Sequence, residues 1–184
     1  ILGANTLSSA YDVANSVRFN DDDSPSMFKT PGSGGDQRTW TFSTWFKRGN
    51  IGSSQWILDA YDGSNDEFHI YISSGNAIGI YTTGGGFGNN LSISTSNLVR
   101  DVSAWYHLVY AFDTGQGTAA NRFKWYINGV LQSGYNTTTT PSQNADLFNS
   151  SGSTFRIGRA FGDESRYADM YVAEYYYCLL YTSD

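Results

Sequence analysis

Residues 62–67 carry side chains that could hold a calcium ion. They read Asp-Gly-Ser-Asn-Asp-Glu, so Asp62, Asn65, Asp66 and Glu67 offer side-chain oxygens close together. Calcium takes about six to eight oxygen ligands from carboxylates, amides and carbonyls, which makes this segment a candidate Ca²⁺ site. The alternative is a solvated turn held by hydrogen bonds from its own Asp and Asn side chains. A second acidic cluster lies at residues 21–23.

Several ring-bearing residues could bind a carbohydrate. A sugar site needs flat aromatic rings for stacking and a few polar groups that fix the ligand's orientation. The candidates are His69, Tyr71, Tyr81, Trp105, His107 and Tyr126. If their side chains share one outward sheet face, they form a platform. The alternative is that Trp105 and His107 are framework residues under a loop, and that the tyrosines are ordinary half-buried strand residues.

Carboxylate pairs for glycoside hydrolysis are hard to find. Such enzymes place two carboxyls about 5–9.5 Å apart, and same-face neighbours on a strand lie about 6.8 Å apart. Asp169 and Glu174 point to opposite faces unless a bulge intervenes, and so do the adjacent Asp66 and Glu67. A pair assembled from distant strands stays open as an alternative, but the sequence favours a binding domain over an enzyme.

Charge and composition argue against nucleic acids and membranes as partners. The net charge is −6, with 11 basic and 17 acidic residues and no basic block, so we expect no nucleic-acid binding. No apolar run approaches the ~20 residues that span a bilayer, so we expect no membrane insertion. The single cysteine, Cys178, cannot form an intrachain disulfide, which fits synthesis in a reducing cytoplasm.

Strict alternation of apolar and polar residues predicts many short strands. It is clearest over 67–73, where the even positions are apolar. The other predicted strands are 17–19, 27–30, 40–47, 55–61, 77–83, 90–94, 105–113, 122–127, 154–159 and 167–177. Asn128-Gly129 favours a type I′ hairpin turn, whereas 137–140 reads as a biased loop. No helix longer than two turns is predicted, so the pattern indicates a sandwich or barrel.

Four segments resemble laminin G-like domains. Residues 105–113, with the order Trp-Tyr-His, are similar to their W-x-H strand, and 122–130 to the strand and Asn-Gly hairpin that follow. Residues 155–159 and 167–177 resemble their closing pair. The likeness implies an all-β, two-sheet antiparallel jelly-roll sandwich of the concanavalin A-like type. It implies one domain over 1–177, with 178–184 as an unrelated or truncated tail.

The likeness also bears on metals and catalysis. Some domains of this fold bind calcium in a rim loop, which supports testing 62–67. Glucanases share the fold, but their Glu-x-Asp-x-x-Glu signature is absent here. Glu174 falls on the same parity as Met170 and Val172, so we expect a buried carboxylate that needs a partner. Arg18 is the expected partner, because first and last strands commonly pair in this fold.

Three phrases, at 16–24, 38–50 and 113–122, are similar to a subgroup found in tail and other structural proteins of bacteriophages. The resemblance implies a virion protein, made in the host cytoplasm, with oligomers formed through the parent protein. The expected function is recognition of a polysaccharide or cell-surface glycan, with calcium organising a rim loop. A purely structural virion domain, and a glycan-depolymerising hydrolase or lyase, are the alternatives. Fold alone does not choose among them.

Overall fold

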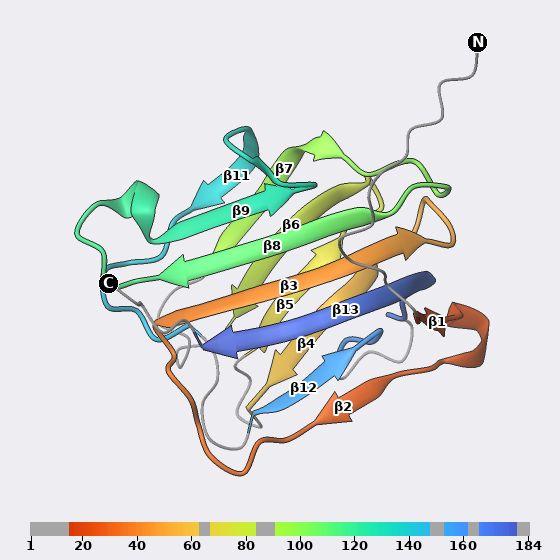
Figure 1. Ribbon diagram of the computed structural model, residues 1–184, viewed down its shortest axis with the longest axis horizontal. Helices are drawn as coiled ribbons and strands as arrows, with labels where there is room; N and C mark the ends of the chain where they lie inside the picture. The colour runs from red at the N-terminus through yellow and green to blue at the C-terminus, as the bar shows by residue number, and fades with distance from the viewer. Residues whose placement is uncertain (1–14, 63–66, 84–90, 148–152, 162–165, 180–184) are drawn as a thin grey trace.

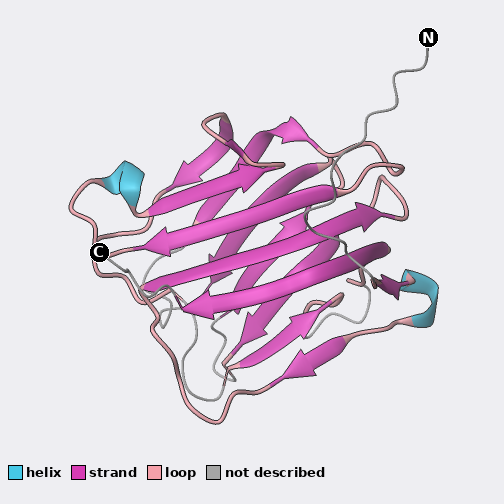
Figure 2. Ribbon diagram, in the orientation of Figure 1, coloured by secondary structure: helices cyan, strands magenta, loops and turns pink. Residues whose placement is uncertain are grey.

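Two antiparallel sheets face each other and enclose the core (Figure 1). The computed structural model describes residues 15–62, 67–83, 91–147, 153–161 and 166–179. Within these ranges strands dominate, and the helical pieces are the short 3₁₀ turns η1 (Asp21–Asp23) and η2 (Ala119–Asn121) (Figure 2). The predicted all-β jelly-roll sandwich is confirmed. None of the helical turns in the described ranges has the length and apolar character needed to cross a bilayer.

The six-stranded sheet runs along one layer of the sandwich. Its order is β1 (Val17–Phe19), β13 (Met170–Leu179), β3 (Thr39–Arg48), β8 (Tyr106–Asp113), β9 (Phe123–Ile127) and β10 (Val130–Leu131). The central strand β3 alternates between half-exposed and buried positions, so that Trp40, Phe42 and Phe46 point into the core. This period of two is what a half-buried strand requires.

The seven-stranded sheet forms the other layer and carries the site described below. Its order is β11 (Tyr135–Thr139), β7 (Ser92–Leu98), β6 (Ala77–Thr83), β5 (Glu67–Ile72), β4 (Gln55–Tyr61), β12 (Thr154–Ile157) and β2 (Met27–Lys29). In β5, Phe68, Ile70 and Ile72 are fully buried. The alternate residues of this strand therefore belong to the outer face of the sheet.

Aromatic rings join the two layers. Trp40 of β3 lies 4.3 Å from the ring of Phe112 on the neighbouring strand, and 5.5 Å, edge to face, from Phe68 of the opposite sheet. Tyr110 and Trp125 stack at 5.4 Å on the same inner face. Large rings supply much apolar area per residue, so a sandwich of this size can be held by few side chains.

Some strand boundaries differ from the prediction. Residues 137–140 were expected in a loop, but β11 pairs with β7, with Thr138 opposite Ile93. A run of threonines gives no hydrophobic alternation, although β-branched residues suit an edge strand. At the other end, β13 continues through Cys178 and Leu179, which pair with Thr41 and Trp40.

The expected pair of Arg18 with Glu174 is wrong. Strands β1 and β13 do pair, with Arg18 opposite Tyr171, but Arg18 forms its ion pair with Asp169, just before β13. Glu174 has a φ of 51°, and the register of β13 shifts between Ala173 and Tyr176. This bulge removes Glu174 from the alternation on which the prediction depended. The Tyr176 hydroxyl donates to its carboxylate instead.

Two phenylalanines test how much the aromatic core contributes. Phe112→Ala removes a fully buried ring and should lower the free energy of unfolding by about 3–5 kcal/mol. Phe28→Ala removes a ring that is 75% exposed and should change it by less than about 0.5 kcal/mol. Urea unfolding of both variants measures the difference. Equal losses would contradict this account of the core.

Candidate functional site

A hollow of about 260 Å³ opens on the outer face of the seven-stranded sheet. It is lined by Trp56, Glu67, His69, Tyr71, Tyr81 and Arg166. Strand register brings the lining residues together, because Trp56 of β4 pairs with Tyr71 of β5, and His69 of β5 pairs with Tyr81 of β6. Glu67 lies two residues before His69 and so shares its face.

Ring faces form the walls of this hollow. Trp56 and Tyr71 stack with centroids 6.0 Å apart, and His69 and Tyr81 lie nearly parallel at 6.2 Å. The guanidinium of Arg166 lies over Trp56, 5.2 Å from the ring centroid. Tyr81 is 41% exposed, so a ligand can reach its ring.

Gly79 fixes the position of Tyr71. The two residues are cross-strand partners, and a Cβ atom at position 79 would lie 2.8 Å from the tyrosine ring. The ring therefore lies across the glycine, where any larger residue would displace it. Burial raises the pKa of Tyr71, and the nearby Tyr81 raises it further, so the Tyr71 hydroxyl keeps its proton at neutral pH.

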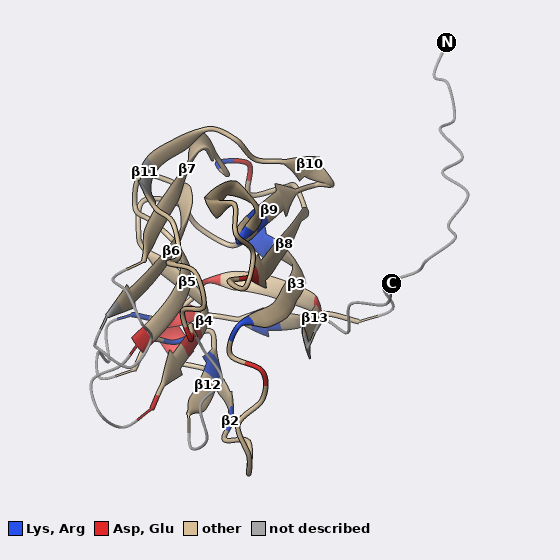
Figure 3. Cartoon of the chain, turned by 90° about the vertical axis from the view of Figure 1, so that its left-hand side faces the viewer, with Lys and Arg blue, Asp and Glu red and all other residues tan. Residues whose placement is uncertain are grey.

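Two carboxylates hold the imidazole of His69. Its Nδ1 lies 2.6 Å from Oδ1 of the fully buried Asp59, and its Nε2 lies 3.0 Å from Oε2 of Glu67. The other Asp59 oxygen accepts a hydrogen bond from the backbone N–H of Phe161 at 3.0 Å and lies 3.8 Å from Arg156 Nη1. Acidic and basic residues meet where β4, β5 and β12 adjoin (Figure 3).

These contacts decide the charge of His69. Burial by itself lowers the pKa of the imidazole, but the hydrogen bonds and negative charges of Asp59 and Glu67 outweigh it, so the pKa lies above the usual 6.5. Nε2 makes a hydrogen bond to Glu67, whereas Nδ1 faces Asp59 as an ion-pair contact. The site thus places an imidazole between a fully buried carboxylate and a second, partly exposed carboxylate that lines the hollow.

The other three predicted sugar-binding residues lie on the opposite sheet. Trp105 directly precedes β8, His107 belongs to β8 and Tyr126 to β9. His107 stacks on Trp45 at 4.7 Å, and its Nε2 lies 3.0 Å from Ser43 Oγ. Burial lowers the pKa of His107. The structure therefore brings His69, Tyr71 and Tyr81 together but does not unite all six candidates on one face.

Only part of the predicted calcium segment belongs to the described residues. Asn65 and Asp66 lie outside them, Asp62 follows β4, and Glu67 engages His69. Within the described ranges no group of three or more His, Cys, Asp or Glu side chains could hold a metal ion. Glu67 thus has one oxygen already bonded to a protein group. Calcium at 62–67 stays a prediction.

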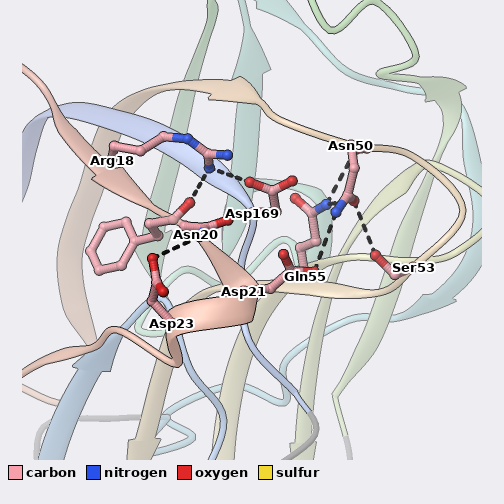
Figure 4. A network of polar contacts seen from close by, with 9 residues as sticks. Arg18, Asn20, Asp21, Asp23, Asn50, Ser53, Gln55 and Asp169 are labelled. Carbon is pink, nitrogen blue, oxygen red and sulfur yellow. Dashed lines mark hydrogen bonds and ion pairs between the residues drawn. The ribbon is translucent and has the colours of Figure 1, made fainter.

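The second acidic cluster, Asp21–Asp23, forms the turn η1 and contacts amide side chains (Figure 4). Asn20 donates to Asp23 at 2.7 Å, and Asn50 donates to Asp21 at 3.3 Å. Asn50 also accepts from Gln55 at 2.5 Å. These bonds tie the turn to the loop after β3.

Sequence reasoning missed Trp56, Asp59 and Arg166. Trp56 gave no alternation signal because β4 is buried at almost every position and shifts register between Trp56 and Leu58. Asp59 did give a signal, since a lone carboxylate inside an apolar strand needs partners. Arg166 reaches the hollow from a segment that precedes β13, and no local pattern indicates that approach.

The chain belongs to the concanavalin A-like lectin/glucanases superfamily, whose laminin G-type family profile matches residues 20–175. No curated protein matches it. Among solved structures, it is similar to a heptameric SAP-like pentraxin from Limulus polyphemus, at 16% identity and a TM-score of 0.61, over 94% of this chain and 81% of that one. It is also similar to domains LG4-5 of the mouse laminin α1 chain, at 11% identity and a TM-score of 0.65. This match covers 90% of this chain and 42% of the laminin chain.

A third similar structure is the CBM40 domain of the Ruminococcus gnavus IT-sialidase bound to α2,3-sialyllactose. The identity is 16% and the TM-score 0.52, and the match covers 92% of each chain. Identities this low show a shared fold. The ligand-binding residues of this chain have to be argued from its own hollow.

The charged state of His69 predicts a pH-dependent stability. Its pKa is raised on folding, so its contribution is complete below about pH 6.5 and is lost as the pH rises through the folded value. The free energy of unfolding of the wild type should therefore fall more steeply above that pH than that of His69→Gln. Chemical denaturation between about pH 5.5 and 8.5 measures this.

The chain's other histidine supplies a control of opposite sign. Because the pKa of His107 is lowered, its contribution is lost as the pH falls, and His107→Gln should leave the alkaline slope of the wild type unchanged. Identical slopes in wild type and His69→Gln would contradict the proposed charge on His69.

Proposed function

We propose that this domain binds a carbohydrate in the hollow on the outer face of its seven-stranded sheet. The observation that carries the proposal is the convergence there of aromatic ring faces with a carboxylate, an imidazole and a guanidinium. A pyranose ring has flat C–H faces that stack on aromatic rings and hydroxyl groups that need fixed polar partners. Tyr71 and Tyr81 supply the rings, with Trp56 stacked against Tyr71, and Glu67 and Arg166 supply the polar partners.

Similar structures support this choice of ligand class. One of them is described as bound to α2,3-sialyllactose, and another as a putative carbohydrate binding protein from Bacteroides ovatus, at 16% identity and a TM-score of 0.59 over 88% of this chain. Shared fold does not transfer a ligand. The likeness to these structures makes the aromatic hollow the first site at which to test carbohydrate binding.

The parent protein, in this proposal, is a phage virion protein that attaches to a glycan on the host surface. The support is the likeness of 16–24, 38–50 and 113–122 to phage structural proteins. A fluorescent fusion of the domain should stain host cells and lose that staining after the surface polysaccharide is removed. Staining that persists would oppose a glycan receptor. Self-association in light scattering without any sugar binding would favour the structural role instead.

The aromatic walls should carry much of the affinity. Tyr71→Ala and Tyr81→Ala each remove a stacking face, and loss of such a central ring costs about 2 kcal/mol or more, which is a fall in affinity of about thirtyfold or more. Calorimetry with a polysaccharide selected from a glycan array measures the loss. Tyr171→Ala, a 37% exposed tyrosine on the opposite sheet, is the matched control and should bind as the wild type does.

Gly79 offers a test that leaves every lining residue in place. Gly79→Ala should weaken binding of the same polysaccharide several-fold, because its Cβ atom displaces the Tyr71 ring by contact. Circular dichroism and thermal unfolding check that the sheet persists. Unchanged affinity in a folded variant would show that the position of Tyr71 is unimportant for the ligand.

Calcium at 62–67 is proposed as an organiser of the segment that leads into Glu67. EDTA should then reduce sugar binding, and added Ca²⁺ should restore it and raise the melting temperature. Asp62→Asn should weaken both effects. If EDTA changes neither affinity nor melting temperature, the segment is a solvated turn.

A further inference from the structure

The carboxylate of Glu67 lines the hollow, and its position is held by His69. Its Oε2 lies 3.0 Å from His69 Nε2, and the same imidazole lies 2.6 Å from the buried Asp59. We propose that Glu67 is the principal acceptor for the ligand, that His69 is its positioning residue, and that the ligand is a glycan unit with two hydroxyls on adjacent ring carbons. This inference rests on the proposed function.

The hold on Glu67 starts from Asp59, which cannot move. Asp59 is fully buried, and its second oxygen accepts the backbone N–H of Phe161 at 3.0 Å. The strand register places Asp59 opposite His69, so the imidazole plane is fixed by a short contact on one side and by Tyr81 along its face. With the ring held in this plane, its Nε2 lies toward Glu67 and makes the hydrogen bond to Oε2. Glu67 therefore presents a fixed orientation to the ligand.

A carboxylate fixed in this way selects a pair of hydroxyls. Ionised carboxyl groups only accept hydrogen bonds, and each oxygen has about two acceptor positions. His69 occupies one position on Oε2, which leaves acceptor positions on both oxygens. Two hydroxyls on neighbouring carbons can donate to the two oxygens at once, and such bidentate contacts add geometric specificity to their energy. A sugar unit with one isolated hydroxyl would donate to only one of the two Glu67 oxygens.

The side-chain contacts also predict what removes the hold. Nε2 of His69 makes the hydrogen bond to Glu67, and Nδ1 of the same ring faces the buried Asp59. Arg156 lies 3.8 Å from Asp59, and Arg166 lines the edge of the hollow. Removing the imidazole should therefore release Glu67 from its fixed orientation and weaken sugar binding.

The binding experiment compares intact and periodate-treated polysaccharides. Periodate cleaves the bond between carbons that carry adjacent hydroxyls, and borohydride then reduces the aldehydes. Dextran, mannan and the polysaccharide selected on the array serve as probes, each in both forms. We expect wild-type binding to fall at least about tenfold on oxidation, and the same loss for Glu67→Gln on the intact form. Glu174→Gln, on the opposite sheet, is the matched control and should bind normally.

A second comparison tests the positioning role of His69 with a conservative variant. His69→Ala has no side-chain donor for Glu67, whereas His69→Gln keeps an N–H donor. We expect His69→Ala to lose affinity for the intact polysaccharide as Glu67→Gln does, and His69→Gln to recover part of it. Wild-type affinity in a folded His69→Ala, checked by thermal unfolding, would overturn the positioning role.

The outcomes separate this inference from the proposed function. Two results would overturn the inference: equal binding of intact and oxidised polysaccharide, or normal binding by Glu67→Gln. If Tyr71→Ala still loses binding in either case, the carbohydrate site itself is supported. No wild-type binding to any intact polysaccharide would remove both.

Discussion

The structure depends on the burial of aromatic side chains between two sheets. Trp40 and Phe112 from one layer meet Phe68 from the other, and none of the three is exposed. Once one face of a strand is committed to this core, the period of two sends every alternate residue outward. The residues that face the hollow are therefore fixed by the core: Phe68 and Ile70 point inward, so Glu67, His69 and Tyr71 cannot. The site is a consequence of the packing on its reverse side.

That constraint explains why a costly charge is tolerated next to the core. Asp59 is fully buried in a strand that is apolar at most positions, and a buried carboxylate is expensive unless it is paired and hydrogen-bonded. It receives the Nδ1 side of His69, a backbone N–H from Phe161 and the nearby charge of Arg156. A hydrophobic residue of similar size would pack there at lower cost in free energy. The contacts of Asp59 orient the imidazole toward Glu67, and the proposed function gives this arrangement a reason to exist.

Much of this could be predicted from the sequence, and the failures have physical causes. Alternation over β5 and β6 predicted that His69, Tyr71 and Tyr81 share one face, because the period of two in a strand shows directly which side chains lie on the same side of the sheet. It could not show that Trp105 and His107 belong to the other layer, since both layers alternate alike and only long-range strand order separates them. Bulges were the second cause. The bulge in β4 interrupts the alternation next to Trp56, and the bulge in β13 moves Glu174 out of register. No local sequence pattern predicts a bulge reliably. Asp59 differs from these cases, because a lone carboxylate inside an apolar strand does indicate that it needs partners.

The arrangement of Asp59 and Glu67 helps to decide whether the hollow is suited to binding a glycan or to hydrolysing it. Glycosidases need two carboxyls that both reach the scissile bond, one as acid and one as base or nucleophile. Here Asp59 and Glu67 are bridged by one imidazole, and Asp59 is inaccessible from the hollow because it is fully buried. A ligand in the hollow meets Glu67 alone, and one oxygen of that carboxylate is already bonded to His69. A single accessible carboxylate can accept hydrogen bonds from hydroxyls, but it does not make up the pair that hydrolysis requires. Among the described residues, the geometry at this hollow therefore favours recognition over bond cleavage.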